Sequence, residues 1–133
     1  MKYHDFLGQV QARGRLSSTE DAVKATRATL TVLATRLAGN EADDLAAQLP
    51  EEIGRFLTGH DDTERFNVKE FFARVSEMEG VDLPQSIHHA RAVVSVVQDA
   101  VAEGEIKDIR QQLPDDFAPL FDAGSEGRLN LAE

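Results

Sequence analysis

Cysteine is absent from this sequence of 133 residues. Without thiols the chain cannot form disulfides, bind an iron–sulfur cluster, use a thiolate nucleophile or build a zinc site with cysteine ligands. Aromatic residues are also few, at 6%, so leucine, valine, isoleucine and alanine must fill the interior. Hydrophobic residues make up 41% of the chain, which is enough for one domain or for two small halves that share one core.

Long hydrophobic runs are missing too. The longest spans residues 92–97 and falls far short of the roughly 20 residues that a membrane-spanning helix needs. The N-terminal residues, Met1 to Asp5, lack the apolar core of a signal peptide. Together with the absence of cysteine, these features predict a cytoplasmic protein that has no membrane partner.

Positive charge is scarce. The sequence has 14 lysine and arginine residues against 24 aspartate and glutamate residues, and its formal net charge is −10. A field of this sign repels nucleic acids and anionic membranes, and no cluster of basic residues provides a local exception. We therefore expect no nucleic-acid partner. The simple interpretation of the acidic excess is solubility, and the more specific one is a basic partner.

The sequence also lacks the motifs of common catalytic and metal sites. Its nine glycines are dispersed, so no glycine-rich loop can cradle a phosphate, and no serine stands in a nucleophile motif. His88 and His89 are adjacent, about 100° apart around a helix, and cannot both face one metal ion. The acidic run 61–64 lacks the glycine and the remaining ligands of a calcium loop. We expect no catalytic residue, no metal site, no cofactor and no enzymatic activity.

One phrase is present twice, at residues 41–50 (EADDLAAQLP) and at residues 105–114 (EIKDIRQQLP). Glutamate, aspartate, glutamine, leucine and proline recur in the same order at an offset of 64 residues. The pattern predicts an all-α fold, in which two tandem pseudo-repeats of about four helices each are packed into one compact helical domain. We place the first repeat at residues 1–57, a linker at 58–66, the second repeat at 67–121 and a flexible tail at 122–133.

Each half contains one long helix in this pattern. The first should run from about residue 19 to 38 after a Ser18 cap, and the second should start after an Asp82 cap. Asn67 should cap the helix before it. Residues 92–101 are rich in valine, which favours strands, but burial of a helical stripe outweighs this propensity. The two stripes are Val23, Thr26, Leu30, Leu33 and Leu37, and Ile87, Ala90, Val94, Val97 and Val101.

Residues distributed along nearly the whole chain carry a resemblance to a known family. They are Tyr3, Phe6, Val10, 25–30, Leu33, Arg36, Leu37, Glu41, Ala42 and 45–50 in the first half, and Phe71, Arg74, Val75, Gly80, Val81, 89–93 and 112–121 in the second. In these positions the chain resembles a bacterial family known only as domain-of-unknown-function family 2267. The two Gln-Leu-Pro phrases are its most specific part. The resemblance implies an all-helical bacterial protein and carries over no activity, ligand or catalytic residue.

Three polar residue types are kept at equivalent positions of the two halves: an arginine on each long helix, and an aspartate and a glutamine on each short helix. The simpler interpretation is structural, with each arginine holding the aspartate or the glutamine of the short helix. The alternative is a pair of symmetric polar pockets that bind a small anion or a partner carboxylate. The residues are Arg27, Asp44 and Gln48, and Arg91, Asp108 and Gln112.

These observations predict a non-enzymatic protein–protein interaction module or structural module, a monomer or homodimer whose protein partner is unidentified. A duplicated helical body without reactive groups can present paired surfaces or a groove to such a partner. The alternative is a small-ligand or metal-binding protein that uses the repeated arginine, aspartate and glutamine positions. A large exposed apolar patch would favour the first interpretation, and a deep pocket with converging polar groups would favour the second.

Overall fold

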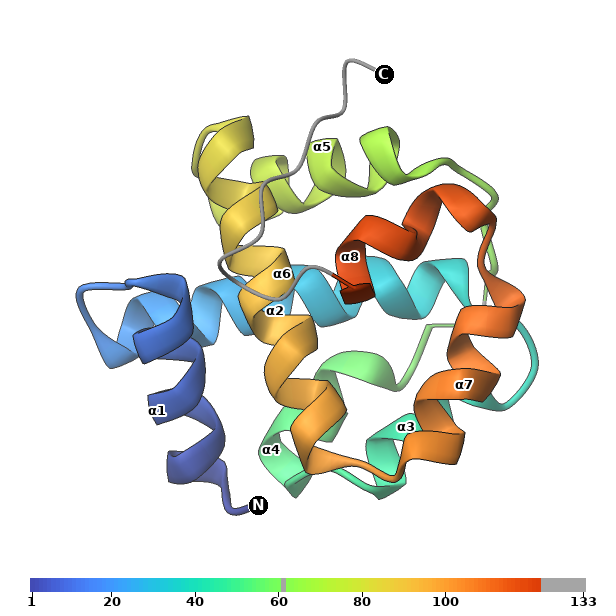
Figure 1. Cartoon of the computed structure of the whole chain (residues 1–133), viewed down its shortest axis with the longest axis horizontal. Helices are drawn as coiled ribbons and strands as arrows, with labels where there is room; N and C mark the ends of the chain where they lie inside the picture. The colour runs from blue at the N-terminus through green and yellow to red at the C-terminus, as the bar shows by residue number, and fades with distance from the viewer. Residues whose placement is uncertain (61, 123–133) are drawn as a thin grey trace.

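The computed structural model describes residues 1–60 and 62–122, and within these ranges it contains helices and no strand. The expected all-α fold is therefore confirmed, including the valine-rich segment 92–101, which is helical up to Ala100. None of the described helices is both long and apolar enough to cross a membrane. Figure 1 shows their arrangement. In chain order the elements are α1 (Tyr3–Gly14), α2 (Thr19–Arg36), α3 (Glu41–Ala47), α4 (Glu51–Gly54), η1 (Arg55–Leu57), α5 (Val68–Glu79), α6 (Leu83–Ala100), α7 (Glu103–Gln112), η2 (Asp115–Phe117) and α8 (Ala118–Asp122).

The two long helices, α2 and α6, cross each other at the centre of the molecule (Figure 1). Both are buried on most sides rather than along one stripe. Side chains outside the expected stripes, such as Ala25, Val32 and Ala92, are also 3% exposed or less. The stripes predicted from the sequence are thus too narrow. Helices buried on most sides must be covered by several neighbours, and here the neighbours come from both halves of the chain.

The shorter helices α1 and α5 each pack on both long helices. Their buried faces carry aromatic side chains that are 0% exposed, Phe6 on α1 and Phe71 on α5. A polar contact adds to the packing of α1, because the Arg13 guanidinium donates to Ser95 Oγ at 2.7 Å and pairs with the Asp99 carboxylate at 2.6 Å. The first helix of the chain is therefore attached to the long helix of the other half.

Side-chain caps define the starts of three helices at the residues predicted from the sequence. Ser18, Asn67 and Asp82 each accept a hydrogen bond from the backbone N–H three residues later, at 3.1, 2.9 and 2.9 Å. Each cap satisfies an N–H group that the first helical turn leaves unpaired, and contributes about 1 kcal/mol. The end of the first long helix is predicted less well. Helix α2 ends at Arg36, two residues before the expected boundary, and Gly39 has the left-handed φ of 63° in the following turn.

The segment 58–66, expected as a linker, has no helix in its described residues and runs past the C-terminal end of α2. Thr63 Oγ donates to the Leu37 carbonyl oxygen at 3.0 Å, and the Glu64 N–H donates to the Thr35 carbonyl oxygen at 2.7 Å. These bonds hold the segment against the C-terminal end of α2. The repeat limits 1–57 and 67–121 stay predictions.

The expected tail at 122–133 begins one residue too early. Asp122 is the last residue of α8, and its carboxylate pairs with the Arg110 guanidinium at 2.6 Å. This ion pair joins α8 to α7. The rest of the expected tail, residues 123–133, lies outside the described residues.

The turns after α1 and α5 both use a residue in the left-handed conformation. Arg15 has φ 53° and ψ 44°, and Gly80 has φ 79° and ψ 33°. For a residue other than glycine this conformation brings Cβ close to the carbonyl oxygen and costs about 1 kcal/mol. Arg15 is the only non-glycine residue with a positive φ in the described part of the chain. Its backbone is therefore strained, whereas that of Gly80 is not.

Replacement of Arg15 by glycine should raise the free energy of unfolding by about 0.5 to 1 kcal/mol, because glycine relieves the strain although it also makes the unfolded chain more flexible. Gly80→Ala is a matched control of opposite sign. It should lower the free energy of unfolding by about 1 kcal/mol through strain alone, since no neighbouring atom lies within 4 Å of the new Cβ. Urea unfolding followed by circular dichroism measures both effects, and changes of the same sign would contradict the assignment.

Candidate functional site

Helices α3 and α7, which contain the two copies of the repeated phrase, lie side by side at one end of the molecule (Figure 1). Each turns a fully buried apolar side chain into the core: Leu45 of α3 is 0% exposed and Ile109 of α7 is 1% exposed. Their first turns are acidic, which is where the helix dipole favours negative charge. The core thus anchors one side of each helix, and carboxylates remain on the other sides.

Two glutamines join these helices to the opposite halves of the chain. The Ala102 N–H, just before α7, donates to Gln48 Oε1 at 2.8 Å. The Ala38 N–H, just before α3, donates to Gln112 Oε1 at 2.8 Å. Gln48 follows α3 and Gln112 ends α7, so each of these two helices is bonded to the residues that precede the other. They set the position of α3 relative to α7.

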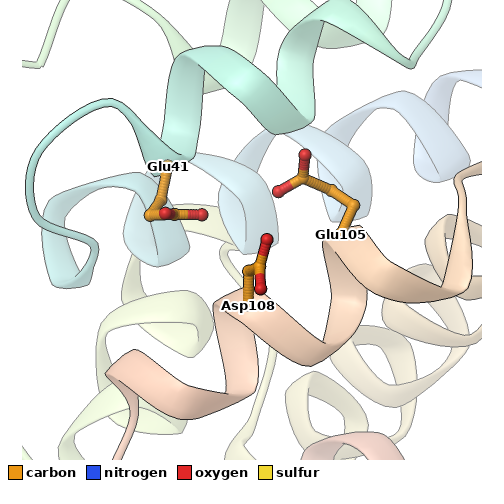
Figure 2. A group of neighbouring side chains, drawn as sticks. All are labelled: Glu41, Glu105 and Asp108. Atoms are coloured by element: carbon orange, nitrogen blue, oxygen red, sulfur yellow. The ribbon is translucent and has the colours of Figure 1, made fainter.

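Three carboxylates converge between the two helices (Figure 2). Glu41 extends from α3 toward Glu105 and Asp108 of α7, and one carboxylate oxygen from each residue lies within 4.8 Å of the others. Glu41 and Glu105 are half-buried, and Asp108 is exposed. Atom Oε2 of both glutamates is shielded from solvent and has no hydrogen-bond partner among the described residues. Oε1 of Glu105 accepts a hydrogen bond from Gln48 Nε2 at 3.1 Å.

This arrangement opposes the ionisation of Glu105. Burial raises the pKa of Glu105, and the negative charges of Glu41, Asp44 and Asp108 raise that pKa further. The hydrogen bond from Gln48 acts in the opposite direction and lowers it. Because the pKa of Glu105 in the folded protein lies above its ordinary value, the ionised carboxylate opposes folding at neutral pH. A cation bound at the cluster would relieve this repulsion.

Carboxylate oxygens bind two kinds of cation, which are hard metal ions and the guanidinium or ammonium groups of proteins. A calcium ion takes about six to eight oxygen ligands, so three side chains would leave much of its coordination shell to water. A guanidinium group needs only hydrogen-bond acceptors in a suitable arrangement, which carboxylates provide. The site can therefore bind a cationic group without further ligands from this chain.

The two arginines of the predicted polar set stand on the long helices α2 and α6. The Arg27 guanidinium lies over the Phe56 ring, 5.8 Å from its centroid, and the Gln48 amide that it was expected to hold is bonded across the α3–α7 contact. Arg91 of α6 is 2% exposed, and burial lowers its pKa. Arg27 thus contacts a ring rather than the Gln48 amide, and a contact of Arg91 with Asp108 or Gln112 stays a prediction.

The other four members of the predicted set belong to α3, α7 and their ends. Gln48 and Gln112 form the bonds between the halves, Asp108 is part of the carboxylate cluster, and Asp44 acts on the cluster through its charge. The two glutamates of the cluster were not among the site residues predicted from the sequence. The sequence does contain a signal for them, because a glutamate opens both copies of the repeated phrase, at positions 41 and 105.

Substitution of Glu105 by glutamine should stabilise the protein at neutral pH by about 0.5 kcal/mol, the scale of one screened charge pair. The amide oxygen can still accept the bond from Gln48, while the repelled charge is lost. Since the pKa of Glu105 is raised by folding, this advantage should disappear as the pH falls below the ordinary glutamate range, where the native carboxyl is protonated in both states.

Thermal unfolding of the Glu105→Gln variant between neutral and acid pH measures this difference. Glu103→Gln is the matched control, because Glu103 is exposed on the same helix. A gain in stability that is equal for both variants, or that persists unchanged at acid pH, would contradict the role given to the cluster.

A comparison with models of known protein families finds a match over nearly the whole of this helical body. A family model described as "Uncharacterized conserved protein (DUF2267)" matches residues 3–120. The comparison with curated proteins finds no match to the chain. The matched range includes all helices from α1 to α7 and therefore both sides of the carboxylate cluster. The resemblance inferred from the sequence is confirmed, and the chain belongs to the DUF2267 family of uncharacterized conserved proteins.

Proposed function

We propose that this protein is a non-enzymatic interaction module that binds a lysine- or arginine-rich segment of a partner protein. The binding surface is the acidic face, which we define as the carboxylates of α3 and α7. The observation that carries the proposal is the convergence of three of them within 4.8 Å, with two shielded oxygens that no described residue bonds. The acidic face consists of Glu41, Asp43, Asp44, Glu103, Glu105 and Asp108.

The acidic face has little positive charge of its own. Six acidic side chains stand on α3 and α7 against two basic ones, Lys107 and Arg110. Arg110 is already paired with Asp122 at 2.6 Å, so Lys107 is the basic side chain of these helices that has no ion pair among the described residues. The excess supports a partner with several positive charges, because complementary charge speeds encounter and determines orientation.

An extended basic segment suits this face better than a single metal ion. The six carboxylates are distributed along two helices, and a divalent ion at the cluster would leave the more distant ones unneutralised. Arginine and lysine side chains of a peptide can meet several carboxylates at once, and arginine can bond a carboxylate with two parallel N–H donors. The partner that we propose is therefore a protein with a basic segment.

The test compares two variants with the same change in net charge. Glu41→Gln, Glu105→Gln and Asp108→Asn together remove the cluster, whereas Asp5→Asn, Glu20→Gln and Glu77→Gln remove three exposed carboxylates elsewhere. Fluorescence anisotropy with an arginine-rich peptide should show about tenfold weaker binding for the cluster variant, as expected for loss of charged contacts worth about 1.4 kcal/mol. The control variant should bind within about threefold of the parent protein.

Two results would overturn this proposal. Equal weakening by both triple variants would mean that the peptide responds to net charge alone. Calorimetric binding of Ca²⁺, Mg²⁺ or Mn²⁺ that the cluster variant loses, without peptide binding by the parent protein, would instead assign the cluster to a metal ion. Loss of peptide binding in the cluster variant alone, with no metal binding, supports the proposal.

We further infer that the body arose by duplication of a four-helix unit. Each half begins with a helix of 12 residues followed by one of 18 residues. The reciprocal bonds of Gln48 and Gln112 connect positions at the same offset of 64 residues that relates the repeated phrases. The packing shows the same reciprocity, because α1 packs on α6 of the second half and α5 packs on α2 of the first half.

Neither half should fold alone under this inference. A unit of about 60 residues buries too little surface, and its long helix would lose the cover that the other half provides. Separately produced chains of residues 1–57 and 67–121 should show little helix by circular dichroism and should regain it when mixed. A half that folds as a stable monomer would contradict the shared core.

A further inference from the structure

A small polar pocket lies at the other end of the two long helices. It has a volume of about 270 Å³ and lies between the turn that joins α1 to α2 and the turn that joins α5 to α6. Helices α2 and α6 begin at these turns and end near α3 and α7, which carry the acidic face (Figure 1). The pocket is thus a separate feature, large enough for a molecule of a few heavy atoms beyond water.

A buried histidine–glutamate pair forms part of its lining. His89 of α6 is 8% exposed and Glu79 at the end of α5 is 7% exposed. His89 Nδ1 lies 2.5 Å from Glu79 Oε2. The other carboxylate oxygen, Oε1, is shielded from solvent and has no hydrogen-bond partner in the described part of the chain. A buried carboxylate that is only partly bonded favours a positive charge or a donor nearby.

The pair leaves one ring nitrogen of His89 for a ligand. When the imidazole is neutral, Nδ1–H donates to the carboxylate and Nε2 keeps its lone pair. His89 lines the pocket and forms no second hydrogen bond with the residues that the structure describes. Nε2 can therefore accept a hydrogen bond from an N–H or O–H group in the pocket, and its partner Glu79 strengthens it as an acceptor.

The two walls of the pocket differ in charge. The wall from α1 and α2 has two cations, Arg15 and Lys24, against one anion, Asp21. The wall from α5 and α6 has the carboxylate of Glu79 beside His89. One wall therefore favours a negative group and the other a positive group, which is the complement of a ligand with both charges.

We propose that this pocket binds a small zwitterion with an ammonium group and a carboxylate, such as a free amino acid. The ammonium group donates to His89 Nε2, and the carboxylate faces Arg15 and Lys24. A metal ion fits less well, because the only group of three or more suitable ligands among the described residues is the cluster of α3 and α7. This site is independent of the basic partner proposed for the acidic face.

The backbone of Arg15, which lines the pocket, is strained. Arg15 holds a left-handed conformation that glycine occupies in the equivalent turn, at Gly80. Residues held in such sparsely populated conformations cluster at active sites and ligand sites. The Arg15→Gly substitution can therefore distinguish an effect on binding from an effect on stability. It removes the guanidinium from the pocket, and it also relieves the backbone strain.

The test uses the full chain with ¹⁵N-labelled histidine rings, followed by nuclear magnetic resonance. Glycine, L-serine and L-aspartate are titrated, together with acetate and methylamine, which carry only one of the two charges. We expect at least one amino acid to shift the ring nitrogens of His89 in a saturable manner, with little change at the exposed His4 and His60. Acetate and methylamine should bind about tenfold more weakly or worse.

Three variants complete the test. Arg15→Gly should weaken amino-acid binding by about tenfold while its unfolding temperature does not fall, a combination that a purely structural role cannot produce. Lys24→Met should weaken binding in the same direction, and Lys69→Met, an exposed lysine on α5, should not. The proposal is overturned if no amino acid shifts His89, if acetate binds as well as the amino acids, or if Arg15→Gly binds as the parent protein does.

Discussion

The crossing of α2 and α6 is the contact on which the rest of the structure depends. Both helices are buried on most sides, largely through alanine, valine, leucine and threonine side chains. The helices of one half cannot cover such a pair, so α1 and α5 each pack on both long helices. Burial of apolar surface is the dominant favourable term in folding, and here it requires the two halves to form one core.

The crossing also creates two different ends. The turns that precede α2 and α6 meet around His89 and Glu79, and the segments that follow them lead into α3 and α7. At the second end, hydrogen bonds from Ala38 and Ala102 to the glutamines of the opposite half bring acidic helices together. Both ends hold glutamates with a shielded carboxylate oxygen that no described residue bonds, and such an oxygen favours a cationic group or a donor nearby.

Much of the fold could be predicted because its signals are local. A cap such as Ser18, Asn67 or Asp82 bonds a backbone group three residues away, so a short stretch of sequence contains the whole interaction. The candidate site could be predicted only in part. Repetition pointed to Gln48 and Gln112, but their partners are backbone N–H groups, which no side-chain pattern reveals. Burial around α2 was underestimated because one apolar stripe assumes cover from one side.

The sequence by itself determined the helical class, the starts of the capped helices, the acidic excess and the absence of thiol chemistry, because these follow from composition and from contacts between near neighbours. Only the tertiary structure decided that Glu41 meets Glu105 and that His89 meets Glu79. Those contacts depend on the relative placement of separate helices. That placement is a property of the packed core as a whole, and no short segment of the chain contains it.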